Sequence, residues 1–432
     1  MARYATVLSM VWALGCQTTT AAPDRDAGFD SSGAPLDVVD DDPARGDVSI
    51  EVAAQEDAAG PDASPRGDAA TVDVPAARDA ADVDVAPPRP ALRVTGYYAA
   101  WMQDAVPPSA LALEAVTHVI HFSLVPRADG TLDAAENVLS AAHVRDAVAA
   151  VHAAGRKVLV SVGGAGTRDG FVGAWSPARR DAFVSRIVQF VASNGYDGVD
   201  IDVEPLLDAD ADAFRAFARA LHRALRARLP DALLTAAVAD APSVYTPVQT
   251  LFDQLNVMTY DLSGPWPGWV TWHNAALDNG GARFPSTGAP LPTATARINA
   301  FVRSGIDRAR LGVGIDFYGY DWTGASGPLQ PIAGVTMRPL SYDEVFTRYA
   351  SRGEMRWDPA ARVPYVSVAA SRGEPAHFVS FDDARSAVEK VGYARREGLG
   401  GVMIWELAGG HRASLPRPER QSLLRAVGAA AR

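Results

Sequence analysis

The chain has 432 residues and a formal net charge of −11, with 51 Asp and Glu side chains against 40 Lys and Arg. Residues 17–90 hold 17 acidic and 5 basic side chains, so this segment carries the negative charge and residues 91–432 are neutral. A neutral body with only two lysines lacks the basic surface that nucleic-acid binding needs. No apolar run reaches the ~18 residues of a membrane span, and the single cysteine excludes an internal disulfide.

The first 16 residues have the order of an export signal. Arg3 precedes a short apolar run, and Gly15 comes just before Cys16, where a small residue is typical of a cleavage site. This segment resembles the signal peptide of bacterial lipoproteins, and the resemblance implies that Cys16 is lipidated. The lipid would be the only membrane contact and would hold the exported protein at an outer or cell-surface membrane. The alternative is an ordinary cleaved signal and a secreted protein.

Residues 17–90 form a linker rich in Ala, Asp and Pro, with Phe29 as the only aromatic residue. Such a segment cannot bury enough apolar surface to offset the entropy lost on ordering, and its like charges extend it. We therefore predict a disordered linker. An acidic patch that binds calcium is the alternative, although the segment shows no fixed spacing of ligands.

Short runs rich in β-forming residues recur after residue 91, and helical patterns separate them. The runs are 94–101, 117–125, 157–164, 198–204, 233–239, 254–261, 311–319 and 401–407, and the clearest helical patterns are 177–195, 208–229 and 382–398. Strands that alternate with helices indicate parallel crossover units. Eight such units predict an α/β fold, a closed (β/α)8 TIM barrel over residues 91–432. An open doubly wound sheet is the alternative, but no G-x-G-x-x-G motif follows the first strand.

One connection is too long for a simple crossover. Residues 320–378 are rich in Gly, Pro, Arg and aromatic side chains, with one helix-like run near 341–349. We predict a small insertion between the seventh and eighth strands, on the face formed by the carboxyl ends of the barrel strands. A long loop without its own fold is the alternative.

A row of acidic residues ends the fourth predicted strand. The segment 197–204 reads DGVDIDVE, and strand alternation places Asp200, Asp202 and Glu204 on one face, with neighbours about 6.6 Å apart. Carboxyl groups packed together inside a barrel are electrostatically unfavourable. Active sites of such barrels lie at the carboxyl ends of the strands. The row therefore indicates a catalytic site, whereas a solvated strand face is the alternative.

This D-G-x-D-x-D-x-E segment matches the catalytic motif of family 18 glycoside hydrolases, the chitinase family. Further stretches resemble motifs of that family in the same order along residues 91–411. They are the S-x-G-G at 161–164, the M-x-Y-D at 258–261 and Trp405 on the last strand.

The resemblance implies a retaining mechanism in which the substrate's own 2-acetamido group is the nucleophile. In that mechanism Glu204 protonates the glycosidic oxygen. Asp202 orients the acetamido N–H and stabilises the cyclic intermediate, while Asp200 shares its proton and charge. Tyr260 hydrogen-bonds the acetamido carbonyl oxygen. The further residues that we predict to bind the substrate are Asp261, Trp405, Tyr98, Met258, Trp266 and Tyr318.

The expected activity is that of a monomeric chitinase that cleaves β-1,4 bonds between N-acetylglucosamine units, with chitin or a related glycan as its partner. We expect no cofactor, no metal and no nucleic acid. Three alternatives stay open: an endo-β-N-acetylglucosaminidase, a peptidoglycan hydrolase, and a chitin-binding lectin without turnover. A metal site built from the same carboxylates is a further alternative, although no histidine accompanies them.

Overall fold

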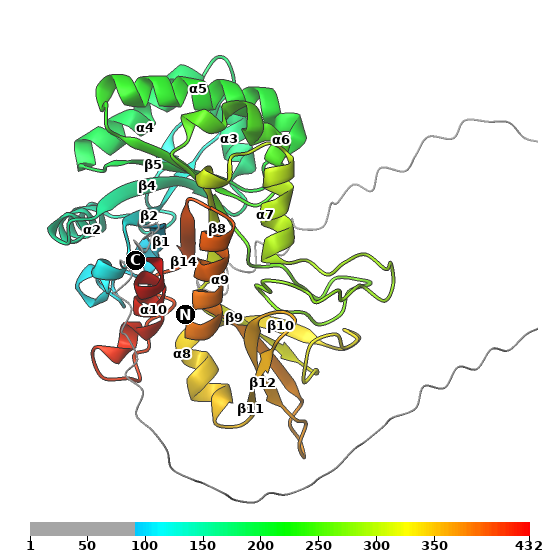
Figure 1. Cartoon of the computed structure of the whole chain (residues 1–432). Coiled ribbons are helices and arrows are strands. Elements are labelled where there is room, and N and C mark those ends of the chain that lie inside the picture. The colour runs from blue at the N-terminus through cyan, green and yellow to red at the C-terminus, as the bar shows by residue number, and fades with distance from the viewer. Residues whose placement is uncertain (1–90) are drawn as a thin grey trace, which may run out of the picture. The chain divides into compact units, whose positions relative to one another are not determined.

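The computed structural model describes residues 91–432 and shows a barrel of parallel strands surrounded by helices (Figure 1). The barrel closes because β1 pairs with β2 on one side and with β14 on the other. The strands, in order around the barrel, are β1 (Arg93–Ala99), β14 (Gly401–Trp405), β8 (Leu311–Asp316), β7 (Gln254–Val257), β6 (Leu233–Val238), β5 (Gly198–Val203), β4 (Lys157–Gly164) and β2 (His118–Pro126). The predicted (β/α)8 barrel is thus confirmed. The predicted signal with Cys16 and the linker 17–90 lie outside the described residues.

The helices cover the outside of the barrel (Figure 1). They are α2 (Ala141–Ala153), α3 (Arg168–Ala174), α4 (Arg180–Asn194), α5 (Ala211–Arg228), α6 (Pro242–Tyr245), α7 (Ala294–Arg303), α9 (Ala384–Arg396) and α10 (Ser422–Ala431). Helix α5 shows why they pack there, because Phe214, Phe217, Leu221 and Leu225 recur at helical spacing and are all buried. None of the helices within 91–432 is long and apolar enough to cross a membrane.

Strand β5 divides its side chains between two layers. Val199, Ile201 and Val203 pack outward into the hydrophobic layer beneath the helices, whereas Asp200 and Asp202 are buried on the opposite face. The alternation of a strand therefore places the carboxylates inside the barrel and leaves the apolar side chains to hold the helices.

The inserted segment is a second sheet with antiparallel strands (Figure 1). Its strands, in spatial order, are β10 (Thr336–Ser341), β9 (Tyr318–Thr323), β13 (His377–Phe381), β12 (Val363–Val368) and β11 (Glu354–Asp358). A helical segment follows β10, made of α8 (Tyr342–Glu344) and a continuation over Val345–Ala350. A two-residue strand, β3 (Leu132–Asp133), pairs with the end of β2.

Four barrel strands end at least two residues earlier than the sequence patterns predict. Strand β1 ends at Ala99, β7 at Val257, β8 at Asp316 and β14 at Trp405, before the predicted ends at 101, 261, 319 and 407. The predicted seventh strand is in fact two strands, since β9 begins at Tyr318 and belongs to the inserted sheet. In each case the chain leaves the barrel at its carboxyl end, so these residues form the mouth of the barrel rather than its wall.

Candidate active site

Asp200 lies at the bottom of the site and is held by three hydroxyl groups. Thr235 Oγ1 donates to its Oδ1 at 2.6 Å, and the hydroxyls of Tyr97 and Ser161 donate to its Oδ2 at 3.1 and 3.4 Å. Burial raises the pKa of Asp200 to about 6, although these hydrogen bonds favour the charged form. Asp200 can therefore exchange a proton near neutral pH.

The raised pKa makes a prediction about stability. Because the folded protein holds this proton more tightly than the unfolded chain, its free energy of unfolding falls as the pH rises from the ordinary value of 3.8 to about 6. A shift of this size corresponds to about 3 kcal/mol. We expect Asp200→Asn to have a higher Tm than wild type at pH 7.5, with a smaller difference at pH 4. A difference that is larger at pH 4 would contradict this assignment.

Asp202 is the next inward-facing residue of β5, and it is 3% exposed. Burial raises its pKa well above the ordinary value, and the charges of Glu204 and Asp200 add to the effect. Its Oδ1 accepts no hydrogen bond from any residue within 91–432. A buried acceptor without a donor costs about 1–3 kcal/mol. Asp202 therefore offers a free carboxylate oxygen to a donor on a ligand.

Glu204 follows the last residue of β5 and keeps part of its side chain exposed. Burial of the carboxyl, together with the charges of Asp261 and Asp240, raises its pKa to about 7. A carboxylic acid with such a pKa holds its proton near neutral pH and can give it to a bound ligand.

Tyr260 lies close to Asp202 and Glu204. Its pKa is raised well above the ordinary value, first by burial and then by the charges of Glu204 and Asp202. The phenol therefore keeps its proton and serves as a hydrogen-bond donor. Its ring packs edge-on against Tyr318, with 6.1 Å between the ring centroids.

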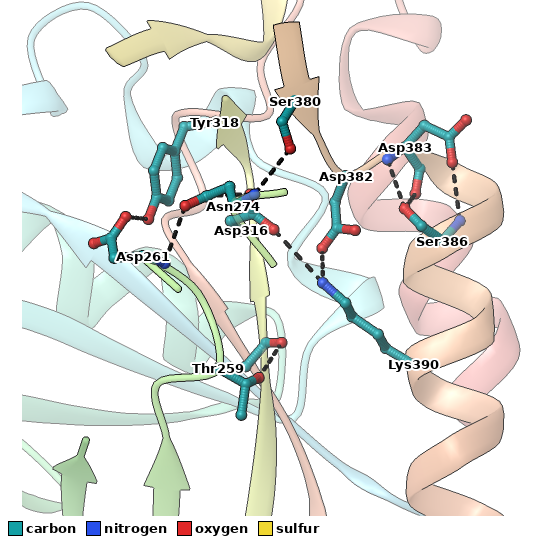
Figure 2. A network of polar contacts seen from close by, with 11 residues as sticks. Thr259, Asp261, Asn274, Asp316, Tyr318, Ser380, Asp382, Asp383, Ser386 and Lys390 are labelled. Carbon is teal, nitrogen blue, oxygen red and sulfur yellow. Dashed lines mark hydrogen bonds and ion pairs between the residues drawn. The ribbon is translucent and has the colours of Figure 1, made fainter. Parts of the chain in front are cut away.

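Asp261 is held by two tyrosines through its carboxylate and by Asn274 through its backbone N–H. The hydroxyl of Tyr318 donates to its Oδ1 at 2.5 Å, and its backbone N–H donates to Asn274 Oδ1 at 3.0 Å (Figure 2). The hydroxyl of Tyr320 donates to the same Oδ1 at 3.1 Å. Its φ of +52° lies in the left-handed region, which is uncommon for a residue other than glycine. The charge of Asp261 acts on Glu204, so Asp261 and its partner Tyr318 lie beside the acidic row.

Aromatic rings form one wall of the barrel mouth. Trp405 ends β14 and is partly exposed. The centroid of its ring lies 4.8 Å from that of Phe122, 5.8 Å from that of Tyr97 and 6.5 Å from that of Trp101. Met258 is buried in the same inward-facing cluster. A rigid, partly exposed indole suits stacking against the apolar face of a sugar ring.

Tyr98, which we predict to bind the substrate, does not face the interior of the barrel. Its hydroxyl donates to the carbonyl oxygen of Val106 at 2.6 Å, its ring stacks on His121, and it is fully buried in the outer layer. The tyrosine inside the barrel is Tyr97. Because Val94 packs outward, strand alternation also turns residue 98 outward, and this signal was available in the sequence.

Trp266 lies in the long loop that follows β7, with its ring 4.4 Å from Trp269. Its binding to a substrate stays a prediction.

Three residues of the site besides Tyr97 were not singled out from the sequence, because single polar or aromatic residues on strands carry no distinctive pattern. They are Thr235, Asn256 and Tyr320, of which Asn256 donates to the hydroxyl of Tyr97 at 3.2 Å.

The row of buried carboxyl groups and the aromatic wall at the mouth of a closed (β/α)8 barrel fit the chemistry of a glycosidase. The chain belongs to family 18 of the glycosyl hydrolases, because the model of that family matches residues 93–410.

The chain is similar to several chitinases. It is 29% identical to chitinase A1 of Niallia circulans in an alignment of 296 positions that covers 60% of this chain and 41% of that protein. The chain thus spans about two fifths of the length of this curated relative. Among solved structures, it resembles the group IV chitinase of Ostrinia furnacalis in complex with allosamidin, with a TM-score of 0.68 at 22% identity over 78% of this chain and 98% of that one. It also resembles human YKL-39, described as a pseudo-chitinase that retains chitooligosaccharide binding, with a TM-score of 0.65 at 19% identity over 79% and 99% of the two chains. At these identities the structural likeness shows the fold.

Proposed function

We propose that this protein is a chitinase that cleaves β-1,4 bonds between N-acetylglucosamine units. The observation that carries the proposal is the pairing of Asp202 and Glu204 in the barrel mouth. Asp202 has a buried oxygen that accepts no hydrogen bond within residues 91–432, and Glu204 holds a proton near neutral pH. An N-acetylglucosamine unit supplies what both groups need, because its acetamido N–H is a donor and its glycosidic oxygen accepts a proton.

The reaction follows from these groups in two steps. Glu204 gives its proton to the glycosidic oxygen while the acetamido carbonyl oxygen attacks the anomeric carbon, so the leaving sugar departs with the proton. Asp202 accepts the acetamido N–H and balances the positive charge of the cyclic intermediate. Tyr260 donates to the acetamido carbonyl oxygen and positions it for attack. Glu204 then takes a proton from water, which opens the intermediate with net retention of configuration.

The pKa of Glu204 predicts the pH dependence of the reaction. Since Glu204 must be protonated to act, kcat/KM should fall about tenfold per pH unit above its pKa of about 7. The measurement is kcat/KM on a chitin oligosaccharide from pH 5 to 9, with the Tm recorded at each pH to exclude unfolding. A profile that stays level to pH 9 would remove Glu204 as the acid.

The substrate is tested by a comparison of three glycans. Purified protein is incubated with chitin oligosaccharides, an N-glycopeptide and peptidoglycan side by side, and the products are analysed by mass spectrometry. We expect cleavage of the chitin oligosaccharides. Cleavage of only the glycopeptide or only peptidoglycan would replace chitin by that glycan. Binding of chitin oligosaccharides without turnover would indicate a lectin, and loss of activity in EDTA would indicate a metal site.

We also propose that the protein is exported as a lipoprotein anchored through Cys16 and that it acts as a monomer. The order of Arg3, apolar run, Gly15 and Cys16 supports the first part. Labelling with a fatty-acid analogue during expression in a bacterium should mark the wild-type protein and leave Cys16→Ala unlabelled. Equal labelling of both proteins would overturn the anchor.

A further inference from the structure

A group of buried charges lies behind the site, between the barrel and α9. Asp316 at the end of β8, Asp382 after β13 and Lys390 of α9 are all fully buried. Lys390 pairs with Asp382, and its Nζ lies 3.7 Å from Asp316 Oδ1 (Figure 2). Burial of such charges is unfavourable unless they are paired. Burial, and then the charge of Asp316, raise the pKa of Asp382 well above its ordinary value, so the pairing with Lys390 does not by itself explain why a second acid is present.

Asp316 connects this group to the active site through one side chain. Its Oδ2 accepts a hydrogen bond from Asn274 Nδ2 at 2.6 Å, and Asn274 Oδ1 accepts the backbone N–H of Asp261 at 3.0 Å (Figure 2). The backbone N–H of Asn274 donates to Ser380 Oγ at 2.9 Å. Because the nitrogen of the Asn274 side-chain amide donates to Asp316, the oxygen of the same amide is turned toward Asp261.

Asp261 needs the hydrogen bond to Asn274 because its backbone conformation is unfavourable. Its left-handed backbone conformation costs on the order of 1–3 kcal/mol and persists only where its surroundings hold it. The contact with Asn274 fixes the backbone while Tyr318 and Tyr320 fix the carboxylate. A change at Asn274 would therefore release the backbone that carries this carboxylate, whose charge acts on Glu204.

We propose that Asp316 is a positioning residue of the active site. Acting through Asn274, and paired with Lys390, it fixes the backbone of Asp261. The inference rests on the proposed glycosidase function, since its effect is read in turnover. The competing explanation is that the charged group only fastens α9 to the barrel, in which case its loss lowers stability and leaves turnover per folded molecule unchanged.

The test compares Asp316→Ala with Asp321→Ala. Asp321 is a matched control because it is 1% exposed, lies on β9, and binds Tyr349 and His377 in a separate cluster. Both variants should lose stability. We expect Asp316→Ala to lower kcat on a chitin oligosaccharide by about 10- to 100-fold, with KM within about threefold of wild type. We expect Asp321→Ala to keep the wild-type kcat. Asp316→Asn, which retains an acceptor for Asn274, should recover most of the lost kcat.

A double-mutant cycle tests whether Asp316 acts through Asn274. If it does, Asn274→Ala lowers kcat as much as Asp316→Ala, and the double variant is no slower than either single one. Effects that multiply in the double variant would overturn the proposal, as would a wild-type kcat in Asp316→Ala. If Asp316→Ala does not fold, a wild-type kcat in Asn274→Ala overturns it. A wild-type protein without turnover overturns the proposed function and this inference together, whereas an active wild type with an equally active Asn274→Ala overturns only the inference.

Discussion

Glu204→Gln should lower kcat on chitin oligosaccharides by about 10³-fold, because the amide cannot protonate the leaving oxygen. The same variant should still bind a chitin tetrasaccharide, since the amide is nearly isosteric with the acid and the aromatic wall around Trp405 is unchanged. Turnover is measured by release of reducing ends, and binding by isothermal titration calorimetry.

The matched control for this variant is Glu397→Gln. Glu397 forms a surface ion pair with Arg308, at 2.8 Å, and follows helix α9. It should retain the wild-type kcat. A Glu204→Gln protein that turns over within about tenfold of wild type would show that another group is the acid.

Asp202→Asn should lower kcat by about 10²- to 10³-fold, the range found when one group that stabilises developing charge is lost. The amide removes the negative charge that balances the cyclic intermediate. The variant should also lose affinity for a thiazoline analogue of that intermediate. Because burial, and then the charges of Glu204 and Asp200, raise the pKa of Asp202, its charged form is unfavourable in the folded protein, and the substitution should not impair folding.

Asp253→Asn is the control for Asp202→Asn. Asp253 precedes β7, at the amino end of the barrel strands, where its side chain accepts from the backbone N–H of Leu234 at 2.8 Å. The substitution there should leave kcat and thiazoline binding unchanged. Equal inhibition of wild type and Asp202→Asn by the thiazoline would argue against a role of Asp202 in the intermediate.

The barrel and its acidic row were predictable because both depend on regular spacing. Alternation along 198–204 separates the carboxylates from the valines and isoleucine, and the structure keeps that separation. The same rule applied to β1 would have selected Tyr97 instead of Tyr98. The error arose because either of two adjacent tyrosines could face the interior. The outward-facing Val94 decides between them, since residues 94 and 98 lie on the same face of the strand.

The contacts around Asp261 could not be predicted in the same way. Asn274, Asp316 and Lys390 are far apart in the sequence and meet only because β8, α9 and the loop after β7 converge. Their pairing depends on distances that no local pattern records. The boundary at Tyr318 was missed for a related reason, since strands β8 and β9 are separated by one residue and read as one run.

The central claim is that the substrate's acetamido group, positioned by Asp202 and Tyr260, opens the glycosidic bond. Proton NMR of the products formed first from a chitin tetrasaccharide tests this claim most directly, because the attack of the acetamido oxygen and the later attack of water together retain the configuration. We predict that the β-anomer forms first and that the α-anomer follows by mutarotation. Initial formation of the α-anomer would contradict the account.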